Sequence, residues 1–352
     1  MSRPLFEAFP RLKERIPFLA IAKLPTPIEA LPQLAPNLWV KRDDKTNSLY
    51  GGNKIRKLEF ILADVLRSGK KELVSFGAIG TNHGVATSIY CLQMDIPLQM
   101  MLFEQPVTPQ VQQNLKLMHR FNAQLHYQGS LFKTAAKFYL GKWLRGRDRY
   151  YLFAGGSTIQ GCLAFVNAAF ELKQQIDAGL LPEPDYIYCP VGSNATLAGL
   201  TLGCGLAGIN SQLIGVRVAP SHIGPIPACT FSTVRKLQRA CYQFLCDLEP
   251  RIKEHKLTKF QLMDNYYGDG YGHASKEGEW AQEMFEQAEL ELDPTYTAKT
   301  AAAALNACAN SPDKKILYWH TYNSANVADI AAKADLDSMP KALQGFIQEP
   351  VV

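Results

Sequence analysis

Short apolar segments alternate with amphipathic segments along most of the chain, and this alternation restricts the folds open to it. Six segments have the length and apolar character of buried strands: 72–76, 98–103, 124–127, 185–189, 212–218 and 315–320. Seven segments have apolar residues at helical spacing: 82–94, 109–121, 131–144, 161–176, 196–206, 277–290 and 297–309. Strands and helices in this order form open, mostly parallel sheets with helices on their faces. We therefore expect an α/β fold.

The length of the chain predicts more than one domain. Its 352 residues exceed the roughly 250–300 at which a single hydrophobic core usually divides. We find no internal repeat and no low-complexity linker that would mark a boundary.

The charge distribution argues against a nucleic-acid partner. The chain has 37 basic and 32 acidic residues, so its net charge is only +5 and is spread along the sequence. The densest basic cluster, residues 142–149 around Trp143, is typical of a solvated helix end.

Cysteine spacing and the N-terminal residues indicate a cytoplasmic protein. The eight cysteines form no Cys-x-x-Cys pair, and no histidines stand at zinc-ligand spacing, so we expect reduced thiols and no metal site. Residues 1–17 include several charged side chains and lack the apolar core of a signal peptide. Residues 186–216 carry no charge, but Pro190 and Asn210 are among the residues that interrupt them, and we expect no membrane span.

A lysine in the first turn of a helix is the first candidate for chemistry. Residues 51–59 read Gly-Gly-Asn-Lys-Ile-Arg-Lys-Leu-Glu, and apolar residues follow at helical spacing up to Leu66. Lys54 and Lys57 lie one turn apart on the same face, so each ammonium group disfavours protonation of the other. A neutral amine is the form that an imine-forming lysine requires. A solvated surface lysine is the alternative for this run alone.

Two turns between a strand and a helix are suited to anions. The first is 77–83, Gly-Ala-Ile-Gly-Thr-Asn-His, and the second is 191–196, Val-Gly-Ser-Asn-Ala-Thr. Backbone N–H groups at such helix starts bind carboxylates or phosphates. A capping turn that uses Thr81 or Asn82 remains an equal alternative for the first turn.

Tyrosines form a further candidate group. Residues 266–272 read Tyr-Tyr-Gly-Asp-Gly-Tyr-Gly, and 293–297 read Asp-Pro-Thr-Tyr-Thr. Phenols that face a site donate protons or hydrogen bonds, whereas aromatic packing beside glycine-rich turns is the alternative.

The segment 203–208 matches the spacing of a dinucleotide-binding fingerprint, G-x-G-x-x-G. Its glycines close a helix and precede a strand, which is the reverse of the context that a dinucleotide site needs. We interpret them as a means of close helix packing.

These motifs together resemble the pyridoxal-phosphate enzymes of the tryptophan-synthase-β-like fold, and within them the group of D-cysteine desulfhydrase and 1-aminocyclopropane-1-carboxylate deaminase. The resemblance is densest from Leu24 to Phe103, which includes Lys-Arg-Asp-Asp at 41–44, and it returns at 185–200 and 264–300. It implies two open, twisted, mostly parallel sheets flanked by helices, with pyridoxal 5'-phosphate between two domains. The large domain would comprise 1–58 and 160–352, and the small domain 59–159.

The resemblance also implies site residues. Lys54 would hold the cofactor as an imine and move protons, with Thr81, Tyr271 and Tyr296 as further catalytic residues. The phosphate would be bound by Lys57, Gly192, Ser193, Asn194, Ala195 and Thr196; Asn82 would bond the ring hydroxyl and Thr321 the pyridine nitrogen. The substrate carboxylate would be bound by Thr81, Asn82 and His83.

The activity implied is a lyase acting on a small amino acid in a cytoplasmic homodimer. The chain has Thr297 after the second tyrosine, where the deaminases carry Glu, and it has His320-Thr321; both resemble the D-cysteine enzymes. We therefore expect elimination of sulfide and ammonia from D-cysteine to give pyruvate. The deaminase reaction, racemisation, and a cofactor-binding protein without turnover are the alternatives.

Three departures from the pattern of the group bear on substrate choice. The serine of the carboxylate turn is Thr81, and the usual Gly-Ser-Gly-Gly-Thr phosphate loop is Gly-Ser-Asn-Ala-Thr at 192–196. Two glycines after Thr321 are replaced by Tyr322 and Asn323, which places bulk near the cofactor ring.

Overall fold

The computed structural model describes residues 3–255, 258–349 and 351, and these form two compact units. Unit 1 contains the chain up to Phe60 and Ser157–Ala325. Unit 2 contains Ile61–Gly156 and the chain from Asn326 on.

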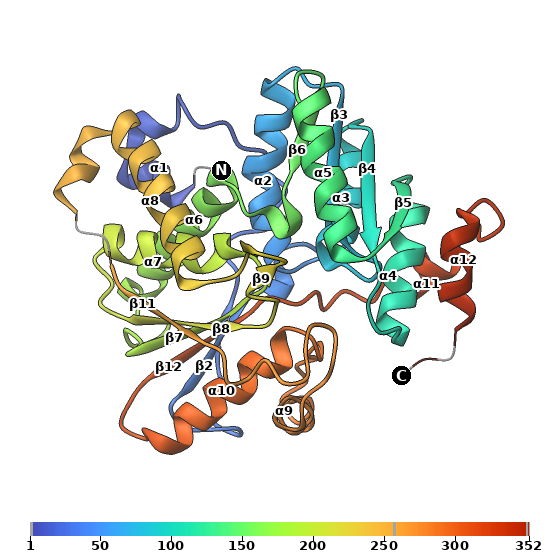
Figure 1. Cartoon of the computed structure of the whole chain (residues 1–352). Helices are drawn as coiled ribbons and strands as arrows, with labels where there is room; N and C mark the ends of the chain where they lie inside the picture. Colours follow the sequence, from blue (N-terminus) through green and yellow to red (C-terminus); the bar gives the residue numbers. More distant parts are fainter. Residues whose placement is uncertain (1–2, 256–257, 350, 352) are drawn as a thin grey trace. The chain divides into compact units, whose positions relative to one another are not determined.

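Unit 1 is built on a six-stranded sheet with the order β1-β2-β12-β7-β8-β11 (Figure 1). All neighbouring strands are parallel except β1 and β2. The strands are β1 (Ile28–Ala30), β2 (Leu38–Arg42), β7 (Tyr186–Val191), β8 (Gln212–Arg217), β11 (Phe260–Met263) and β12 (Ile316–His320). A separate two-stranded hairpin joins β9 (His222–Ile223) to β10 (Ile226–Pro227).

Helices cover both faces of this sheet. The helices are α1 (Pro4–Ala8), the beginning of α2 (Asn53–Arg67), α6 (Ile159–Asp177), α7 (Asn194–Ala207), α8 (Phe231–Leu248), α9 (Lys276–Glu286) and α10 (Thr297–Asn310). Alternate residues of a strand face opposite sides, so in β12 Leu317 and Trp319 belong to one core and Ile316 and Tyr318 to the other. Residues of α1, α6, α7 and α8 complete the first core, and residues of α9 and α10 complete the second (Figure 1).

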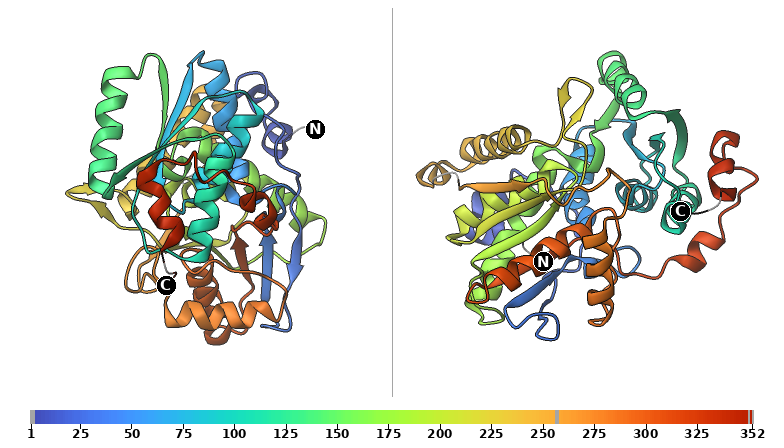
Figure 2. Two further views of the ribbon diagram at one scale, coloured as in Figure 1. Left: turned by 90° about the vertical axis from the view of Figure 1, so that its right-hand side faces the viewer. Right: turned by 60° about the horizontal axis from the view of Figure 1, so that its bottom comes forward.

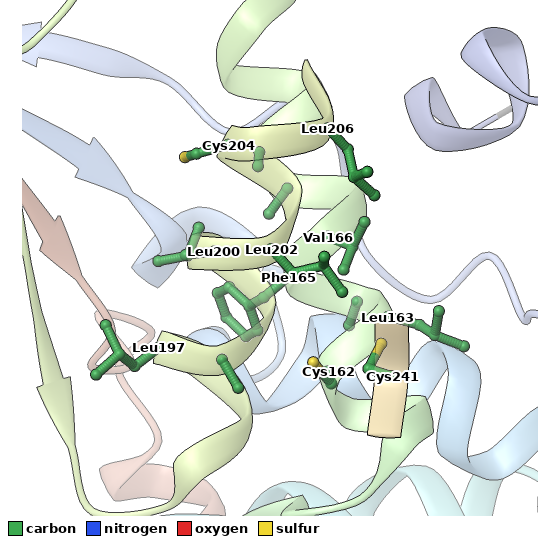
Figure 3. Close-up of a cluster of buried hydrophobic side chains, with 14 of the residues drawn as sticks. Cys162, Leu163, Phe165, Val166, Leu197, Leu200, Leu202, Cys204, Leu206 and Cys241 are labelled. Atoms are coloured by element: carbon green, nitrogen blue, oxygen red, sulfur yellow. The ribbon is translucent and has the colours of Figure 1, made fainter. Parts of the chain in front are cut away.

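Close packing of α6 against α7 explains the glycines at 203–208. Figure 3 shows Phe165 and Val166 of α6 among the leucines of α7. A Cβ at Gly203 would lie 2.6 Å from Cβ of Ala169 and 2.7 Å from the carbonyl oxygen of Val166, so only glycine permits this approach. Gly208 ends α7 in the left-handed conformation, with φ of 72°. The glycines therefore serve helix packing and helix termination, as the sequence predicts.

Unit 2 has a four-stranded parallel sheet with the order β5-β4-β3-β6. Its strands are β3 (Glu72–Ala78), β4 (Leu98–Phe103), β5 (Gln124–Gly129) and β6 (Arg149–Leu152). Its helices are the second part of α2, α3 (Asn82–Gln93), α4 (Pro109–Arg120), α5 (Leu131–Arg145), α11 (Ala328–Ala332) and α12 (Lys341–Gln348).

The C-terminal segment belongs to unit 2, whereas we expected all of 160–352 in the large domain. The helices α11 and α12 pack on α4, as the left view of Figure 2 shows. Gln112 of α4 donates to the carbonyl oxygens of Phe346 and Glu349, and His119 lies 2.8 Å from that of Asp335. Contacts of the side chains of α4 with distant backbone produce this grouping, and strand and helix periodicity does not reveal them.

The predicted segments are present as strands and helices, and the fold is the expected α/β arrangement of mostly parallel sheets with flanking helices. The structure adds elements that the sequence analysis did not predict, chiefly β1, β2, β6, β11 and α8. The helix α8 had a local signal, because Thr230 and Thr233 form a capping box before it.

The eight cysteines are buried and none forms a disulfide, in agreement with the expected reduced thiols. Among the described residues, no helix combines the length and the apolar character needed to cross a bilayer.

The packing of α6 on α7 predicts the effect of one substitution. We expect Gly203→Ala to lower the free energy of unfolding by about 1–3 kcal/mol, because the new methyl group overlaps α6, although alanine favours helix formation. Urea unfolding followed by circular dichroism measures the change. Gly345→Ala in α12 is the control, since a Cβ there meets no atom within 4 Å. Equal stability of Gly203→Ala and the unchanged protein would contradict this account of the helix contact.

Candidate active site

A tight turn fixes the start of α2, the helix that carries Lys54. Gly52 has φ of 94°, and a Cβ there would lie 2.8 Å from the carbonyl oxygen of Thr321. The same oxygen accepts a hydrogen bond from the backbone N–H of Asn53 at 3.1 Å. The backbone N–H of Gly51 donates to Oδ1 of Asn323 at 2.6 Å. The chain after β12 therefore holds the first turn of α2 in one position.

The Lys54 amine loses its proton more readily than an ordinary lysine. Its Nζ donates to Oδ1 of Asn53 at 2.9 Å. Burial lowers the pKa of Lys54 to about 8, and the nearby carboxylate of Asp293 opposes this shift. We expected the ammonium group of Lys57 to disfavour protonation of Lys54, whereas burial is the main cause in the structure.

Lys57 lies one helical turn from Lys54 and reaches the turn after β7. Its Nζ donates to Oγ of Ser193 at 2.9 Å. Burial, and then the charge of Lys54, hold the pKa of Lys57 well below its ordinary value.

The start of α7 has the properties of an anion site. Ser193 is the N-cap residue, but its side chain makes no capping hydrogen bond to the helix. Asn53 Nδ2 is 3.4 Å from Oγ1 of Thr196, which links the α2 turn to this helix. The side chain of Asn194 donates to the carbonyl oxygen of Ala228 at 2.9 Å, and its Oδ1 has no partner among the described residues. Asn194 and Ala195, the first two residues of α7, are both buried.

The two tyrosines singled out in the sequence meet each other. The hydroxyls of Tyr271 and Tyr296 are 2.5 Å apart, and their rings are nearly perpendicular, at 81°. The ring of Tyr296 lies against Gly192, where a Cβ would be 2.7 Å from its Cε1. Burial raises the pKa of Tyr271 to about 12 and that of Tyr296 well above its ordinary value. Both phenols are therefore protonated at neutral pH.

Residues after β12 complete this part of unit 1. Thr321 is buried, and its carbonyl oxygen is the acceptor that holds Asn53. His320 is buried beside Tyr318, 3.2 Å from its hydroxyl, and burial lowers the pKa of His320 to about 4, so the ring is neutral. Tyr322 is also buried, and burial raises its pKa.

The turn predicted to bind a carboxylate lies in unit 2, between β3 and α3. Oγ1 of Thr81 accepts from the backbone N–H of Gly84 at 3.2 Å and so caps α3. Oδ1 of Asn82 accepts from Asn114 at 2.8 Å. The ring of His83 contacts another residue of unit 2, since its Nε2 is 3.1 Å from Oγ of Ser75. The capping alternative thus applies to Thr81, and it is compatible with anion binding by the backbone of the same turn.

The sequence analysis did not single out several residues that organise the site. Asn53 contacts both Lys54 and Thr196, Asn323 holds the turn at Gly51, and Asp293 acts on the charge of Lys54. Asn53 and Asp293 lie within motifs quoted above, so their position beside known candidates was the available signal.

A buried ionic cluster also supports the start of α2. Arg56 donates to Glu171 of α6 at 2.8 Å and to Asp43 at 2.9 Å, and Lys41 of β2 donates to Glu171 at 2.6 Å. Trp319 of β12 donates to Asp43 at 2.7 Å. Although burial acts in the other direction, the charges of Arg56 and Lys41 lower the pKa of Glu171. The cluster ties α2 to β2, α6 and β12.

The comparison with protein families decides the class of this protein. Residues 19–321 match the family model described as pyridoxal-phosphate dependent enzyme. The chain belongs to this family. D-cysteine desulfhydrase of Klebsiella pneumoniae (strain 342) is 32% identical to it over 323 residues, which cover 87% of this chain and 94% of the relative.

Solved structures confirm the fold. An ACC deaminase homologue has 23% sequence identity and a TM-score of 0.73, and the match covers 95% of this chain and all of the other. Threonine deaminase isoform 2 from Solanum lycopersicum has 14% identity and a TM-score of 0.63, covering 93% of this chain and 91% of the other. The family and its relatives place the chain among the pyridoxal-phosphate enzymes of the D-cysteine desulfhydrase and deaminase group, with the tryptophan-synthase-β-like fold.

The residues present in unit 1 fit this cofactor. Pyridoxal phosphate carries an aldehyde, which reacts with an amine, and a phosphate, which needs N–H donors and positive charge. Lys54 supplies an amine of lowered pKa, and the start of α7, whose N-cap side chain makes no capping bond, supplies donors together with Lys57 and Ser193. The substituted loop at Asn194 and Ala195 does not remove these groups.

The pKa of Lys54 predicts how fast the cofactor-free protein takes up pyridoxal phosphate. Because the neutral amine reacts, the rate of appearance of the visible absorption band should rise with pH and level off above about pH 8. An unperturbed lysine, with a pKa of about 10.4, should still gain rate at pH 10. Acetyl-lysine amide measured in parallel is the control. A pH profile that follows this model amine would contradict the lowered pKa.

Proposed function

We propose that this enzyme eliminates sulfide from D-cysteine. One D-cysteine and one water would give pyruvate, hydrogen sulfide and ammonia. The observation that carries the proposal is the Lys54 amine of lowered pKa beside the Lys57–Ser193 contact, in a chain 32% identical to proteins named D-cysteine desulfhydrase.

The cofactor, when bound, supplies an electron-withdrawing system attached to the amino group of the substrate, which acidifies the hydrogen on Cα. Lys54 is the base for that hydrogen. Its lowered pKa suits this role, because a base that is substantially neutral near pH 8 both accepts and releases a proton in that range. Lys57 and Ser193, which contact each other one helical turn from Lys54, would bind the phosphate and so position the cofactor for Lys54.

The tyrosine pair supplies protons on the substrate side. Tyr271 and Tyr296 are protonated and hydrogen-bonded to each other, so one hydroxyl can donate while the other stabilises the oxygen left behind. Their task would be to protonate the leaving sulfur. Thr321 would face the pyridine nitrogen with a hydroxyl, which leaves that nitrogen uncharged and suits rapid loss of a β-substituent.

The carboxylate of the substrate would be bound by the turn that begins α3. Helix starts favour anions, and Thr81, Asn82 and His83 form the first residues of this one. The ring of His83 lies at hydrogen-bonding distance from Ser75, so His83 would bind the carboxylate through its backbone N–H.

Thr297 favours the desulfhydrase reaction over ring opening of 1-aminocyclopropane-1-carboxylate. Its Oγ1 donates to Oδ2 of Asp293 at 2.7 Å, within the cap of α10. Position 297 therefore offers a hydroxyl and no carboxylate. The family resemblance implies that the deaminases carry Glu at this position. We also propose, from the family resemblance, a cytoplasmic homodimer.

The first test follows absorbance and sulfide together. Adding D-cysteine to the cofactor-loaded protein should shift the visible band while sulfide and pyruvate appear. Lys54→Ala should lose the band and the sulfide, because the amine proposed to form the imine is removed. Lys236→Met, at an exposed position of α8, is the matched control.

Other products would replace the proposal by one of its alternatives. 2-Oxobutyrate from 1-aminocyclopropane-1-carboxylate would identify a deaminase, and an inverted amino acid would identify a racemase. A bound band that no amino acid shifts would indicate binding without turnover, which the changes at Asn194 and Tyr322 would explain. An unchanged band in Lys54→Ala would refute the assignment of the lysine.

Thr81 gives a second test, since it has both a capping role and a proposed substrate role. We expect Thr81→Ala to lower kcat/KM roughly 10- to 100-fold while the content of bound cofactor stays near normal. Losing the cap should cost about 1 kcal/mol in stability. Thr81→Ser, which keeps the hydroxyl, should restore most of the rate. Parallel losses of rate and cofactor in Thr81→Ala would mean that the residue is structural.

A further inference from the structure

Two buried charged residues lie at the start of α10, and the reaction proposed above gives neither of them a catalytic role. Asp293 lies just before α10, and Lys299 lies in its first turn. Asp293 is 6% exposed and Lys299 is fully buried. Burying a charge is costly unless its hydrogen bonds are satisfied, so the partners of these two residues indicate what they hold in place.

Asp293 holds the backbone of Tyr296. Its Oδ1 accepts from the backbone N–H of Tyr296 at 2.7 Å. Its Oδ2 accepts from Oγ1 of Thr297 at 2.7 Å and from the backbone N–H of Thr297 at 3.2 Å. The backbone N–H of Asp293 donates to Oγ1 of Thr297 in return, at 2.7 Å. These bonds fix the backbone of the loop before α10 and therefore the position of Tyr296.

Lys299 holds the loop that carries Tyr271. Its Nζ donates to the carbonyl oxygen of Tyr267 at 2.7 Å and to that of Gly270 at 3.2 Å. Gly270 has φ of 141° and is the residue before Tyr271. The segment from Asp264 to Ser275 contains no regular secondary structure, so no strand pairing fixes its backbone. The two hydrogen bonds from Lys299 tie this backbone to α10.

The two positioned tyrosines, Tyr271 and Tyr296, meet at their hydroxyl groups. Tyr296, set by Asp293, and Tyr271, in the loop set by Lys299, approach to 2.5 Å. The ring of Tyr296 also contacts the Gly192 turn, so a shift of Tyr296 would disturb the start of α7. Asp293, just before α10, and Lys299, in its first turn, thus hold both partners of a single short hydrogen bond.

We propose that Asp293 and Lys299 are positioning residues that hold Tyr296 and Tyr271, respectively, in contact with each other. Proton donation by the phenols requires that the two tyrosines stay in contact, so the effect of this positioning on catalysis rests on the proposed function. The charge of Asp293 reinforces the arrangement, because a nearby carboxylate contributes to the raised pKa of both tyrosines and so keeps them protonated.

The test separates positioning from catalysis. The protein is labelled with 3-fluorotyrosine, and the fluorine resonances of the two phenols are assigned from Tyr271→Phe and Tyr296→Phe. Lys299→Met removes both donations to the loop and should shift and broaden the Tyr271 resonance. Asp293→Asn cannot accept the Thr297 hydroxyl at the amide nitrogen and should displace the Tyr296 resonance. Lys276→Met, at an exposed position of α9, is the control and should leave both unchanged.

This measurement needs no substrate, so it stands even if D-cysteine is not turned over. Resonances of Tyr271 and Tyr296 that remain unmoved in folded Lys299→Met and Asp293→Asn would overturn the proposal. If Lys299→Met does not fold, Lys299→Gln keeps a donor on a shorter side chain and should give a smaller shift in the same resonance.

A kinetic cycle connects the positioning to turnover. Lys299→Met should lower kcat roughly 10- to 100-fold with the cofactor band retained. In a Tyr271→Phe background the same change should cost less than about twofold, because the hydroxyl that it positions is already gone. Additive losses would show that Lys299 supports the fold in general and not the phenol. Absence of sulfide from the unchanged protein would instead count against the proposed function.

Discussion

The buried guanidinium of Arg56 is the contact on which the arrangement of unit 1 depends. It binds carboxylates from Asp43 and from Glu171 of α6, and Lys41 and Trp319 complete the cluster. Removing one member of a buried ion pair leaves a charge without a partner, which typically costs about 3–5 kcal/mol. Arg56 stands between Lys54 and Lys57 in the chain but points to another side of the helix. The ionic cluster therefore anchors one side of α2 while the two lysines stay available on the other.

This division of α2 explains how a single helical turn supplies two kinds of chemistry. Lys54 is held by the bond to Asn53 near a carboxylate, and Lys57 is directed to Ser193 at the start of α7. The glycine turn before them is bonded to the chain after β12, so the amine has little freedom to move. Preorganisation of this kind reduces the entropy that a reaction must otherwise lose in bringing groups together.

The sequence predicted the alternation of strands and helices because buried parallel strands and amphipathic helices leave strong local patterns. It also predicted Lys54, Lys57 and the turns, because glycines and helix starts mark them. It did not predict that the ring of His83 lies between Ser75 and Thr87, or that Asp293 and Lys299 position the tyrosines, because individual side-chain hydrogen bonds, which leave no periodic pattern in the sequence, decide these orientations. The C-terminal helices went to the other unit for the same reason.

The burial of the cysteines has a practical consequence for an enzyme that is proposed to release sulfide. Each of the eight thiols lies inside the folded chain, and burial raises the pKa of Cys91 and Cys189 to about 12. Because the thiolate is the reactive form, thiol-directed dyes should capture the released product without modifying the catalyst. The same dyes would label the chain as soon as it opens, so the number of modified cysteines would record how much of the protein has unfolded.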